Sequence, residues 1–497
     1  MAVTGRIDGV PSEVWHEEVL APQFAYEVDF LLRHYVAIEK VLLLEYRRMG
    51  LVDAAGAMAV AERLDAVSPE LMRADPEENM SDISFAIERH VAAGPATPFA
   101  AWHVDRSRND LQACAQLMSA REQLAAVAGA LLEFGRAVVA LAAGSADIPM
   151  PGYTHAQGAQ IITPGFYLAA LSAETLATSQ RLLRTYDEID ASPLGAGTMA
   201  GQELPWDRER MAGLLGFSQA RLHALVAVAS RGWALAITSD LSNFAVALSR
   251  FVTDLMAWGG SEYGFLDLPD ELSGISAAMP QKRNFPVLER IRGRCSHVSG
   301  CAFELMLGQR NTAYTNTVEV SKEAGAHLRT QIETLHSTLR LALAVVRGLA
   351  FRADRMREAC EAEYLGGFTL ANRLTLESGI PWRTAQVIAG SYVRQALDRG
   401  LTPAAPDGSL LEAIAGELGY TVKQPAELLA ATLGVDEGLH AKRSDGSAHP
   451  DAVRTMLAVQ DEELAALSEQ WAVRRRAVTA AAARVDTLLS PHALDRL

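Results

Sequence analysis

The chain has 497 residues, of which 49% are hydrophobic and only 6% are aromatic, and its formal net charge is −15 at pH 7. An acidic chain without a face of clustered Lys and Arg is unlike a nucleic-acid binder, which needs such a face to meet the phosphate backbone. The 4 cysteines form no CxxC pair and lie near no His at metal-ligand spacing, so we expect a reduced, cytoplasmic protein without a metal site.

Ala and Leu are abundant and few segments alternate with the period of a strand, which predicts an all-α fold. The N-terminal stretch contains Arg6, Asp8 and Glu13 instead of a continuous apolar run, so we expect no signal peptide. Apolar residues then recur at three- and four-residue spacing over 27–50, which predicts a helix that ends at a glycine. Shorter helices should follow it in a small N-terminal domain, 1–110.

A run of long apolar helices is predicted for the central domain, 111–364. These segments have helical periodicity and are too hydrophobic for ordinary surface helices, so they belong inside a bundle or at an oligomer interface. The most apolar run, 124–144, contains Glu133 and Arg136 and is interpreted as a buried helix rather than a membrane span. The predicted central helices are 111–145, 164–188, 229–258, 287–311 and 318–350.

Beyond about residue 365 the helices are predicted to shorten. The stretches ESGIPW, DRGLTPAAPDGS and KRSDGSAHP carry Gly, Pro and Ser turn signals between them. We therefore expect a small C-terminal helical domain, 365–497.

Three polar motifs stand beside predicted helix starts. HVDRSRND, 103–110, places Arg106, Ser107, Arg108 and Asn109 before a helix, where side-chain donors and backbone N–H groups together suit a carboxylate. The alternative is a solvated loop whose arginines pair with surface acids.

The second motif, MPGYTHAQGAQ at 150–160, places Thr154 and His155 after a Pro-Gly turn, although a lone His is more often structural than catalytic. The third motif, SGISAAMPQKRNFPVLE at 273–289, is a small-residue loop with a helix start at Pro286. Taken alone, it is equally consistent with a flexible connection. Its polar residues are Ser276, Lys282, Asn284 and Glu289.

Together and in this order, the motifs resemble the signature regions of the argininosuccinate lyase family, in the fumarase/aspartase superfamily. Those regions read close to HTGRSRND, GYTHLQRAQ and GSSxMPQKKN with a Glu five residues on. The resemblance extends over about 30–460 and includes SPLGAGTMAG at 192–201, LPWDRERMAGLLGF at 204–217 and YTNTVEVSKE at 314–323. It implies an all-α subunit whose central helices assemble into a homotetramer, with each active site built from loops of three subunits.

The resemblance also implies elimination of fumarate from an N-substituted L-aspartate, and no motif implies a metal or an organic cofactor. Removing the proton beside a carboxylate builds a second negative charge, which requires a desolvated base and fixed positive charge. By correspondence Ser276, on a loop that closes over substrate, is the base, and Lys282 stabilises the aci-carboxylate. His155 and Glu289 correspond to a hydrogen-bonded pair, whose imidazole is a candidate acid for the departing nitrogen. Thr154 is implied to hold the substrate and is grouped with the catalytic residues. The other residues implied to hold the substrate are Ser107, Arg108, Asn109, Gln160, Asn284, Tyr314, Glu319 and Lys322.

Several residues depart from the family pattern, mostly in the half of the site that recognises the leaving amine. Ile275 replaces a Gly, Ala277 a Ser, Gly158 an Arg and Ser84 a His, and the first helix lacks the family's Gly-Ser and Asp. Glu319 replaces a Gln, and its carboxylate should favour a cationic group on the leaving amine and penalise an additional carboxylate. The succinyl half of the site is therefore nearly intact, and the leaving amine is arginine or another amine.

Other functions remain open alternatives. One is a paralogue that acts on a different amine–succinate adduct, including in the bond-forming direction. Another is a catalytically silent structural relative, against which the retention of Ser276, Lys282, His155 and Glu289 argues. A third is a relative such as adenylosuccinate lyase or a cycloisomerase, although SRND and GYTHAQ favour the argininosuccinate branch. The amine, the physiological direction and allosteric control stay open.

Overall fold

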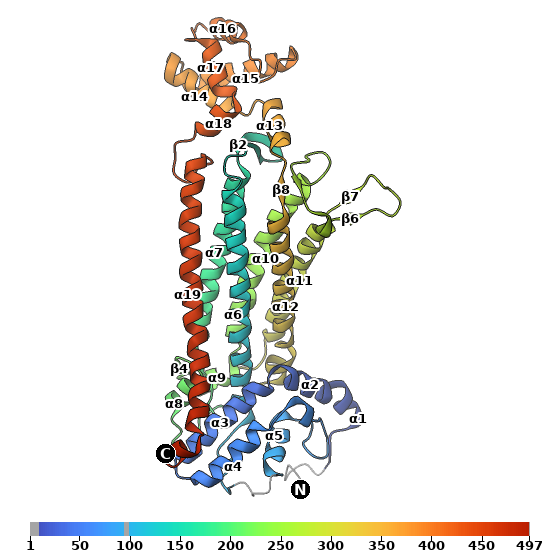
Figure 1. Cartoon of the computed structure of the whole chain (residues 1–497), viewed down its shortest axis with the longest axis vertical. Coiled ribbons are helices and arrows are strands. Elements are labelled where there is room, and N and C mark those ends of the chain that lie inside the picture. Colours follow the sequence, from blue (N-terminus) through green and yellow to red (C-terminus); the bar gives the residue numbers. More distant parts are fainter. Residues whose placement is uncertain (1–8, 94–98, 497) are drawn as a thin grey trace.

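The computed structural model describes residues 9–93 and 99–496. Arg6, Asp8 and part of the Gly- and Pro-rich break after the N-terminal helices lie outside these residues. The subunit is elongated, with long helices side by side, N-terminal helices at one end and a small helical unit at the other (Figure 1). We call these the lower and the upper end of the bundle. The predicted all-α class is confirmed, since the described strands are short and pair only in twos.

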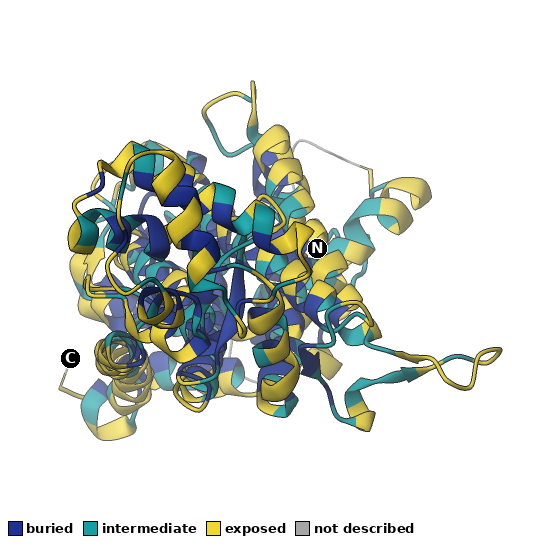
Figure 2. Cartoon of the chain, turned by 90° about the horizontal axis from the view of Figure 1, so that it is seen from above, coloured by how far each residue is buried: buried dark blue, intermediate teal, exposed yellow. Residues whose placement is uncertain are grey.

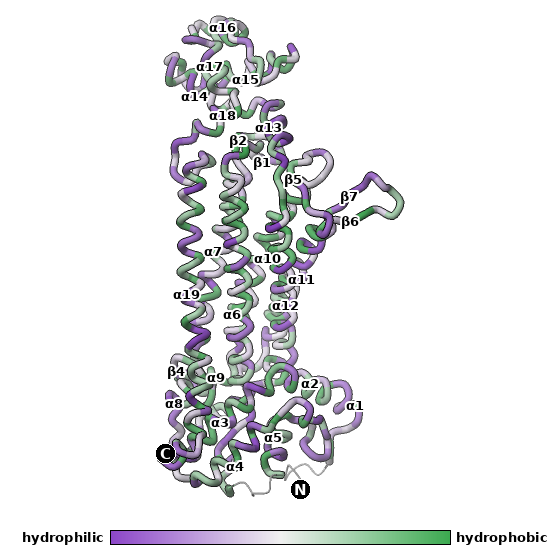
Figure 3. The backbone as a smooth tube through the Cα atoms, viewed as in Figure 1, coloured by the Kyte–Doolittle hydropathy of each residue, from purple (hydrophilic) through white to green (hydrophobic). Residues whose placement is uncertain are grey.

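The body of the subunit is a bundle in which α6 packs against α7, α12 and α19, and α10 packs against α7, α11 and α12. Their side chains merge into one hydrophobic core. The tubes of α6 and α10 are largely apolar or neutral, whereas parts of α19 are hydrophilic (Figure 3). The bundle helices are α6 Arg108–Ala143, α7 Pro164–Ile189, α10 Gly232–Trp258, α11 Pro286–Gln309, α12 Ala326–Gly348 and α19 Pro450–Leu488.

The predicted starts of α6, α7, α10 and α11 agree with the structure to within a few residues, whereas the helix predicted over 318–350 is divided into η4 Glu319–Glu323 and α12 Ala326–Gly348. The Ser107 hydroxyl caps α6 by accepting from the backbone N–H of Asn109 at 3.2 Å. The Thr163 hydroxyl caps α7 at 2.9 Å from the Phe166 N–H, and Pro164 occupies the first turn. Among the described helices, α6 has the length and hydropathy to cross a membrane, but 56% of that apolar window is buried within the structure.

The lower end of the bundle is covered by short N-terminal helices. The helix predicted over 27–50 is divided at Leu31, whose backbone leaves helical geometry between α2 and α3. A two-stranded parallel pair, β3 with β4, and two short helices continue this end after α7. The elements here are α1 Glu13–Trp15, η1 His16–Leu20, α2 Ala21–Phe30, α3 Leu32–Arg48, α4 Ala54–Asp65, η2 Pro69–Leu71, α5 Ile83–Ala92, β3 Ala191–Ser192, α8 Arg208–Leu214, β4 Gln219–Ala220, α9 Ala224–Ala229 and α20 Pro491–Leu494.

The upper end carries three antiparallel strand pairs: β1 with β2, β5 with β8, and β6 with β7. Seen from above, the loop between β6 and β7 projects far from the bundle (Figure 2). The elements here are β1 Met150–Thr154, β2 Gln157–Ile162, β5 Leu266–Asp267, η3 Asp270–Leu272, β6 Gly274–Ile275, β7 Arg283–Asn284, β8 Ala350–Phe351 and α13 Ala353–Ala362. The short helix η4, Glu319–Glu323, lies at the lower end, before α12.

A second hydrophobic core forms in the small helical unit above the bundle. Its helices are α14 Gly367–Ser378, α15 Trp382–Asp398, α16 Gly408–Glu417 and α17 Pro425–Leu433, and α18 Val435–His440 follows the unit. Cys360 and Leu365, before this unit, pack with Val435 and Leu439, after it, and with Ile161 of β2. The chain therefore leaves and rejoins the upper end of the bundle at one small apolar cluster.

The helix α19 follows this unit and runs back along the bundle against α6 and α7. Gly135 of α6 shows how closely the two helices approach, since a Cβ there would lie 2.9 Å from a methyl group of Leu464. The prediction that helices shorten beyond about residue 365 is wrong for α19, which has 39 residues. The three-domain division stays a prediction, and its C-terminal part, 365–497, includes a helix that packs with the central bundle.

Candidate active site

The first polar motif lies at the N-terminus of α6, at the lower end of the bundle. Arg108 is exposed and donates to the Asp82 carboxylate at 2.7 Å, and its guanidinium lies 4.8 Å from the centre of the Phe85 ring. The Asn109 side-chain amide donates to the carbonyl of Thr198 at 3.1 Å. The Ser107 cap, Arg108 and the first backbone N–H groups of α6 thus present donors in one place, which is the arrangement that a carboxylate needs.

Arg106 does not take part in this arrangement, contrary to the expectation from the sequence. Its side chain is buried and forms an ion pair with Glu39 of α3. The guanidinium also lies 5.2 Å from the centre of the Trp102 ring. Arg106 therefore fixes the motif to the N-terminal helices, and Arg108 is the arginine that faces outward.

Asp110 connects the first motif to the SPLGAGTMAG segment. Its buried Oδ2 accepts from the backbone N–H groups of Gly195 and Gly197, each at 3.0 Å. Both glycines have positive φ angles, 85° and 60°, which side chains rarely tolerate. Burial raises the pKa of Asp110 to about 7, although these two N–H groups favour its ionised form. Sequence reasoning named the neighbouring residues of the motif and missed this link.

The second motif forms the β1–β2 hairpin at the upper end of the bundle. Thr154 pairs with Gln157 across a two-residue turn, in which His155 and Ala156 both have positive φ, 54° and 60°, as in a type I′ turn. Non-glycine residues adopt this geometry at a cost, and such strain is found mostly at functional sites. Thr154 and His155 are exposed at the tip, and Gln160 lies opposite Gly152.

Gly158, where the family has an Arg, lies in β2 close to the segment after α13. A Cβ at this position would lie 1.9 Å from a carboxylate oxygen of Glu363, so the Glu363 side chain would have to move to admit a larger residue.

The third motif forms the loop between β6 and β7. The Ser276 hydroxyl accepts from the backbone N–H of Met279 at 3.1 Å, Lys282 is exposed, and Ile275 is 92% exposed. At the base of the loop, Arg283 forms ion pairs with Asp267 of β5 and Asp270 of η3. Asn284 belongs to β7 and Glu289 lies exposed in the first turn of α11.

The remaining predicted residues lie between α11 and α12. Tyr314 and Glu319 are exposed, and Lys322 in η4 forms an ion pair with Glu27 of α2. Burial raises the pKa of the Glu27 carboxyl, and the Lys322 ammonium opposes this shift. The Gln116 amide of α6 donates to the carbonyl of Ser321 at 2.7 Å and so holds η4 beside the lower end of α6. Sequence reasoning missed Glu27.

The predicted site residues thus form groups at opposite ends of one subunit. Ser107, Arg108, Asn109 and Lys322 lie at the lower end, whereas the hairpin and the β6–β7 loop lie at the upper end (Figure 1). The 36 residues of α6 separate the ends by about 54 Å. One isolated chain therefore does not bring the predicted residues together. Within the described residues, no group of three or more His, Cys, Asp and Glu side chains is arranged to hold a metal ion.

Comparisons with known proteins identify the family that the chain resembles. Residues 79–300 match the sequence model of a family described as Lyase. The chain is 30% identical over 407 residues to the argininosuccinate lyase of Methanothermobacter thermautotrophicus, covering 82% of this chain and 87% of that protein. It is 27% identical over 469 residues to argininosuccinate lyase 1 of Shouchella clausii, covering 93% and 94%.

Solved structures share the fold at lower sequence identity. A variant of EDDS lyase with bound fumarate has a TM-score of 0.83 at 23% identity and covers 99% of this chain and 98% of its own. Class II fumarase from Schistosoma mansoni has a TM-score of 0.68 at 16% identity and covers 84% and 94%. The chain belongs to the argininosuccinate lyase family, which comprises carbon–nitrogen lyases of the fumarase/aspartase superfamily.

Proposed function

We propose that the protein eliminates fumarate from an N-substituted L-aspartate, either argininosuccinate or a close relative, in sites shared between subunits of a homotetramer. The observation that carries the proposal is the placement of the family's signature residues in exposed groups about 54 Å apart along α6. Each group can be reached by another subunit, and neither group contains all the residues that the reaction needs. Curated relatives named argininosuccinate lyase and a fumarate complex of a protein of the same fold support the reaction class.

Association of antiparallel subunits would place the lower end of one bundle beside the upper loops of others. Exposed apolar side chains on and beside α10 and α11 support such contacts. Large exposed apolar patches on a single chain usually mark an interface, and symmetric homo-oligomers are the commonest assemblies. These side chains are Val246 of α10, Phe303, Met306 and Leu307 of α11, and Val318 before η4.

In the proposed reaction the Ser276 Oγ, as the alkoxide, takes a proton from the β-carbon of the succinyl group. The electron pair moves onto the adjacent carboxylate and forms the aci-carboxylate, whose second negative charge the Lys282 ammonium stabilises. The dianion then collapses to the double bond of fumarate as the Cα–N bond breaks. The nitrogen leaves with the bonding pair and takes a proton from His155, which Glu289 orients from another subunit.

The other site residues hold the substrate in this proposal. The donors at the N-terminus of α6, Ser107, Arg108 and Asn109, bind one carboxylate, and Thr154 and Asn284 contribute to binding the succinyl group. Gln160, Tyr314, Glu319 and Lys322 line the side of the leaving amine. Closure of the β6–β7 loop over the substrate would cover its exposed Ile275 and exclude water from the reacting atoms.

The test follows fumarate by its absorbance during incubation with argininosuccinate and with other amine–succinate adducts. Ser276→Ala should lose at least about a hundredfold in kcat. Ser273→Ala is the matched control, because Ser273 precedes the loop and its hydroxyl donates to the carbonyl of Pro269 at 2.9 Å. Full activity of Ser276→Ala, or no fumarate from any adduct, would contradict the proposal. In the reverse direction, fumarate with a panel of amines and mass spectrometry of the adducts identifies the amine.

A further inference from the structure

Asp105, in the loop before α6, joins this loop to the segment 202–206. Its Oδ2 accepts from the backbone N–H of Leu204 at 2.8 Å and from the indole N–H of Trp206 at 2.9 Å. Its Oδ1 accepts from the backbone N–H of Glu203 at 3.1 Å, and the Gln202 amide donates to its backbone carbonyl at 2.6 Å. We call these four hydrogen bonds the Asp105 clamp. The clamp connects parts of the chain that lie 97 to 101 positions apart.

The backbone at Asp105 is left-handed, with a φ angle of 58°. Glycine, Asn and Asp reach this conformation at the lowest cost. The signature HTGRSRND, which the first motif resembles, has a glycine at this position. The turn itself therefore does not require a carboxylate, and the side-chain bonds of the clamp are what Asp105 adds to it.

The Asp105 carboxyl is ionised at neutral pH. Burial alone would raise its pKa, but the donations from the Leu204 and Glu203 N–H groups and from the Trp206 indole hold the pKa below its ordinary value. Hydrogen bonds to a charged acceptor are stronger than those between neutral groups. The three side-chain bonds of the clamp are therefore all charge-assisted.

The segment that Asp105 holds is itself packed against α3. Glu45 of α3 is fully buried and accepts from the backbone N–H of Asp207 at 3.0 Å. The Tyr46 and Trp206 rings meet edge to face with centres 5.1 Å apart, and the Tyr46 hydroxyl donates to the carbonyl of Val104 at 2.8 Å. The clamp thus ties the loop before α6 to a well-packed support.

We infer that Asp105 is a positioning residue of the proposed site. Its clamp fixes the loop before α6, and so the position of the donors on Ser107, Arg108 and Asn109 that bind a carboxylate of the substrate. The inference rests on the proposed function and adds to it a residue that does not touch the substrate. A displacement of such donors by about 1 Å is enough to weaken binding, because the geometry of the contact decides its strength. Asp110, on the other side of these donors, is held separately by the Gly195 and Gly197 N–H groups, so the loss of Asp105 should shift the donors without releasing α6.

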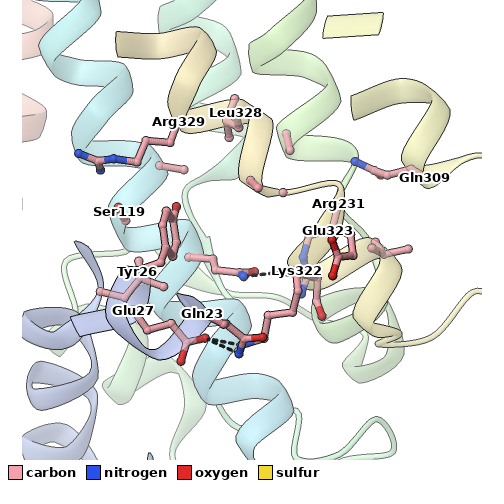
Figure 4. A pocket seen from close by; sticks show the side chains of 18 of the residues that line it. Gln23, Tyr26, Glu27, Ser119, Arg231, Gln309, Lys322, Glu323, Leu328 and Arg329 are labelled. Carbon is pink, nitrogen blue, oxygen red and sulfur yellow. Dashed lines mark hydrogen bonds and ion pairs between the residues drawn. The ribbon is translucent and has the colours of Figure 1, made fainter. Parts of the chain in front are cut away.

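The clamp does not extend to the cavity beside η4. That cavity, of about 350 Å³, lies between α2, α6, α10, η4 and α12, and the buried Arg231 and Lys322 line it, whereas Asp105 does not. Lys322, on the amine side of the proposed site, reaches toward Glu27 and pairs with it there (Figure 4). Loss of the clamp should therefore weaken binding of the succinyl group and leave the preference among amines unchanged.

The experiment measures fumarate release by full-length Asp105→Gly with the amine–succinate adducts that the wild type cleaves. Gly keeps the left-handed turn and removes only the carboxylate. The KM should rise about tenfold with kcat within about threefold, because a carboxylate contact made equally in the ground state and the transition state is lost. The inhibition constant of succinate, which has both carboxylates and no amine, should rise by the same factor. Ratios of kcat/KM between adducts should stay as in the wild type.

Asp105→Asn should return KM to within about threefold of the wild type, because its side-chain oxygen can keep the donations from Leu204 and Trp206. Trp206→Phe removes one donor from the other side of the clamp, keeps the ring against Tyr46, and should raise KM about threefold. Asp207→Gly is the matched control. Its carboxylate accepts from the backbone N–H of Arg210 at 2.9 Å, within the first turn of α8, so the variant should keep the wild-type KM.

Thermal unfolding of each variant shows whether it is folded, and Trp206→Phe decides the question where Asp105→Gly is not. A wild-type KM and succinate inhibition constant in the folded variant overturn this inference alone. A lower kcat at unchanged KM also overturns it, because Asp105 would then be merely structural. No fumarate from any adduct with the wild type overturns the proposed function and this inference with it.

Discussion

Arg283 forms an ion pair with Asp267 at the base of the loop that carries Ser276 and Lys282. The same guanidinium contacts Asp270 at 2.9 Å, and the backbone of Arg283 pairs with that of Ile275. Both ends of the loop are therefore held against the bundle while its middle is exposed. Arg283 is expected to position the loop without touching the substrate.

Replacing Arg283 by Gln should lower kcat about tenfold and leave the thermal midpoint nearly unchanged, since exposed ion pairs contribute at most about 1 kcal/mol. The physical reason is that the loop loses the anchor that sets its position for closure. Arg352→Gln is the control, because Arg352 also contacts Asp267, at 2.7 Å, but follows β8 and is not part of the β6–β7 loop. Equal kcat values for the two variants would show that the anchor has no such role.

Lys282→Met should abolish fumarate release, because no other charge replaces the ammonium beside the aci-carboxylate. Lys282→Arg should not restore it, since a planar guanidinium cannot take the position of a compact ammonium. Both variants should fold normally because Lys282 is exposed. Gln281→Ala, next to it, should turn over substrate at near the parental rate. A near-parental rate for Lys282→Arg would contradict the assigned role.

Sites shared between subunits predict a specific pattern of complementation. Co-expressed Arg108→Gln and Ser276→Ala chains should regain part of the wild-type activity, because some sites in mixed tetramers then draw both residues from intact chains. Ser276→Ala with Lys282→Met should stay inactive, because both residues lie on one loop and every site receives that loop from a single chain. The readout is kcat per tetramer after purification of mixed assemblies. Activity in the second mixture, or none in the first, would argue against shared sites.

The buried Asp110 predicts a pH dependence of stability. Its pKa is about 7 in the folded chain against 3.8 for the ordinary carboxyl, so burial favours the neutral form. The stability that this provides is fully present below about pH 4 and is lost as the pH rises through about 7. Arg106 and Arg208, the nearby cations, stay charged over this range.

Asp110→Asn removes this titration. The free energy of unfolding of the variant relative to that of the wild type should therefore rise with pH between about 4 and 7, by at most about 1.4 kcal/mol per pH unit. Urea unfolding of both proteins at several pH values measures the difference, in which titrations common to both cancel. A difference that does not change with pH would mean that Asp110 titrates near its ordinary value in the folded chain.

Two glycines of the bundle predict opposite effects on stability. A Cβ at Gly165 would lie 2.5 Å from the carbonyl oxygen of Ala142 and 2.7 Å from the Cα of Ala146, which are backbone atoms that cannot move freely. Gly165→Ala should lower the thermal midpoint by several degrees. A Cβ at Gly129 in α6 would meet nothing within 4 Å. Gly129→Ala should therefore raise the thermal midpoint slightly, because Ala favours helix. Calorimetry of both variants tests the pair, and midpoints that shift in the same direction would contradict it.

The central helices could be predicted from the sequence because their signal is local. Apolar periodicity located α6, α7, α10 and α11 to within a few residues, and the structure adds the caps Ser107 and Thr163 at the starts of α6 and α7. The β1–β2 hairpin was not predicted, because its turn uses His155 and Ala156 instead of the Asn-Gly pair that marks such turns. The length of α19 was missed because a turn-rich segment precedes it and its charges hide its apolar stripe.

The candidate site was predictable only as separate motifs. Family resemblance identified residues such as Lys322, but the partner of Lys322, Glu27, lies 295 positions away in the sequence. Likewise, nothing around Arg231 in the sequence shows that its guanidinium is buried at a cavity, since burial depends on how α6, η4 and α12 pack around it. Motifs therefore identify side chains, whereas the charge balance of a pocket depends on tertiary packing.

The cluster where the chain leaves and rejoins the bundle makes the 366–433 unit a self-contained insertion. Cys360 and Leu365 meet Val435 and Leu439 there, so the two attachment points lie side by side. A short linker could close that gap at a small entropic cost, and the long helices would keep their path. This part of the chain is thus free to diverge in length, or to be exchanged by recombination, independently of the helices that hold the chemistry.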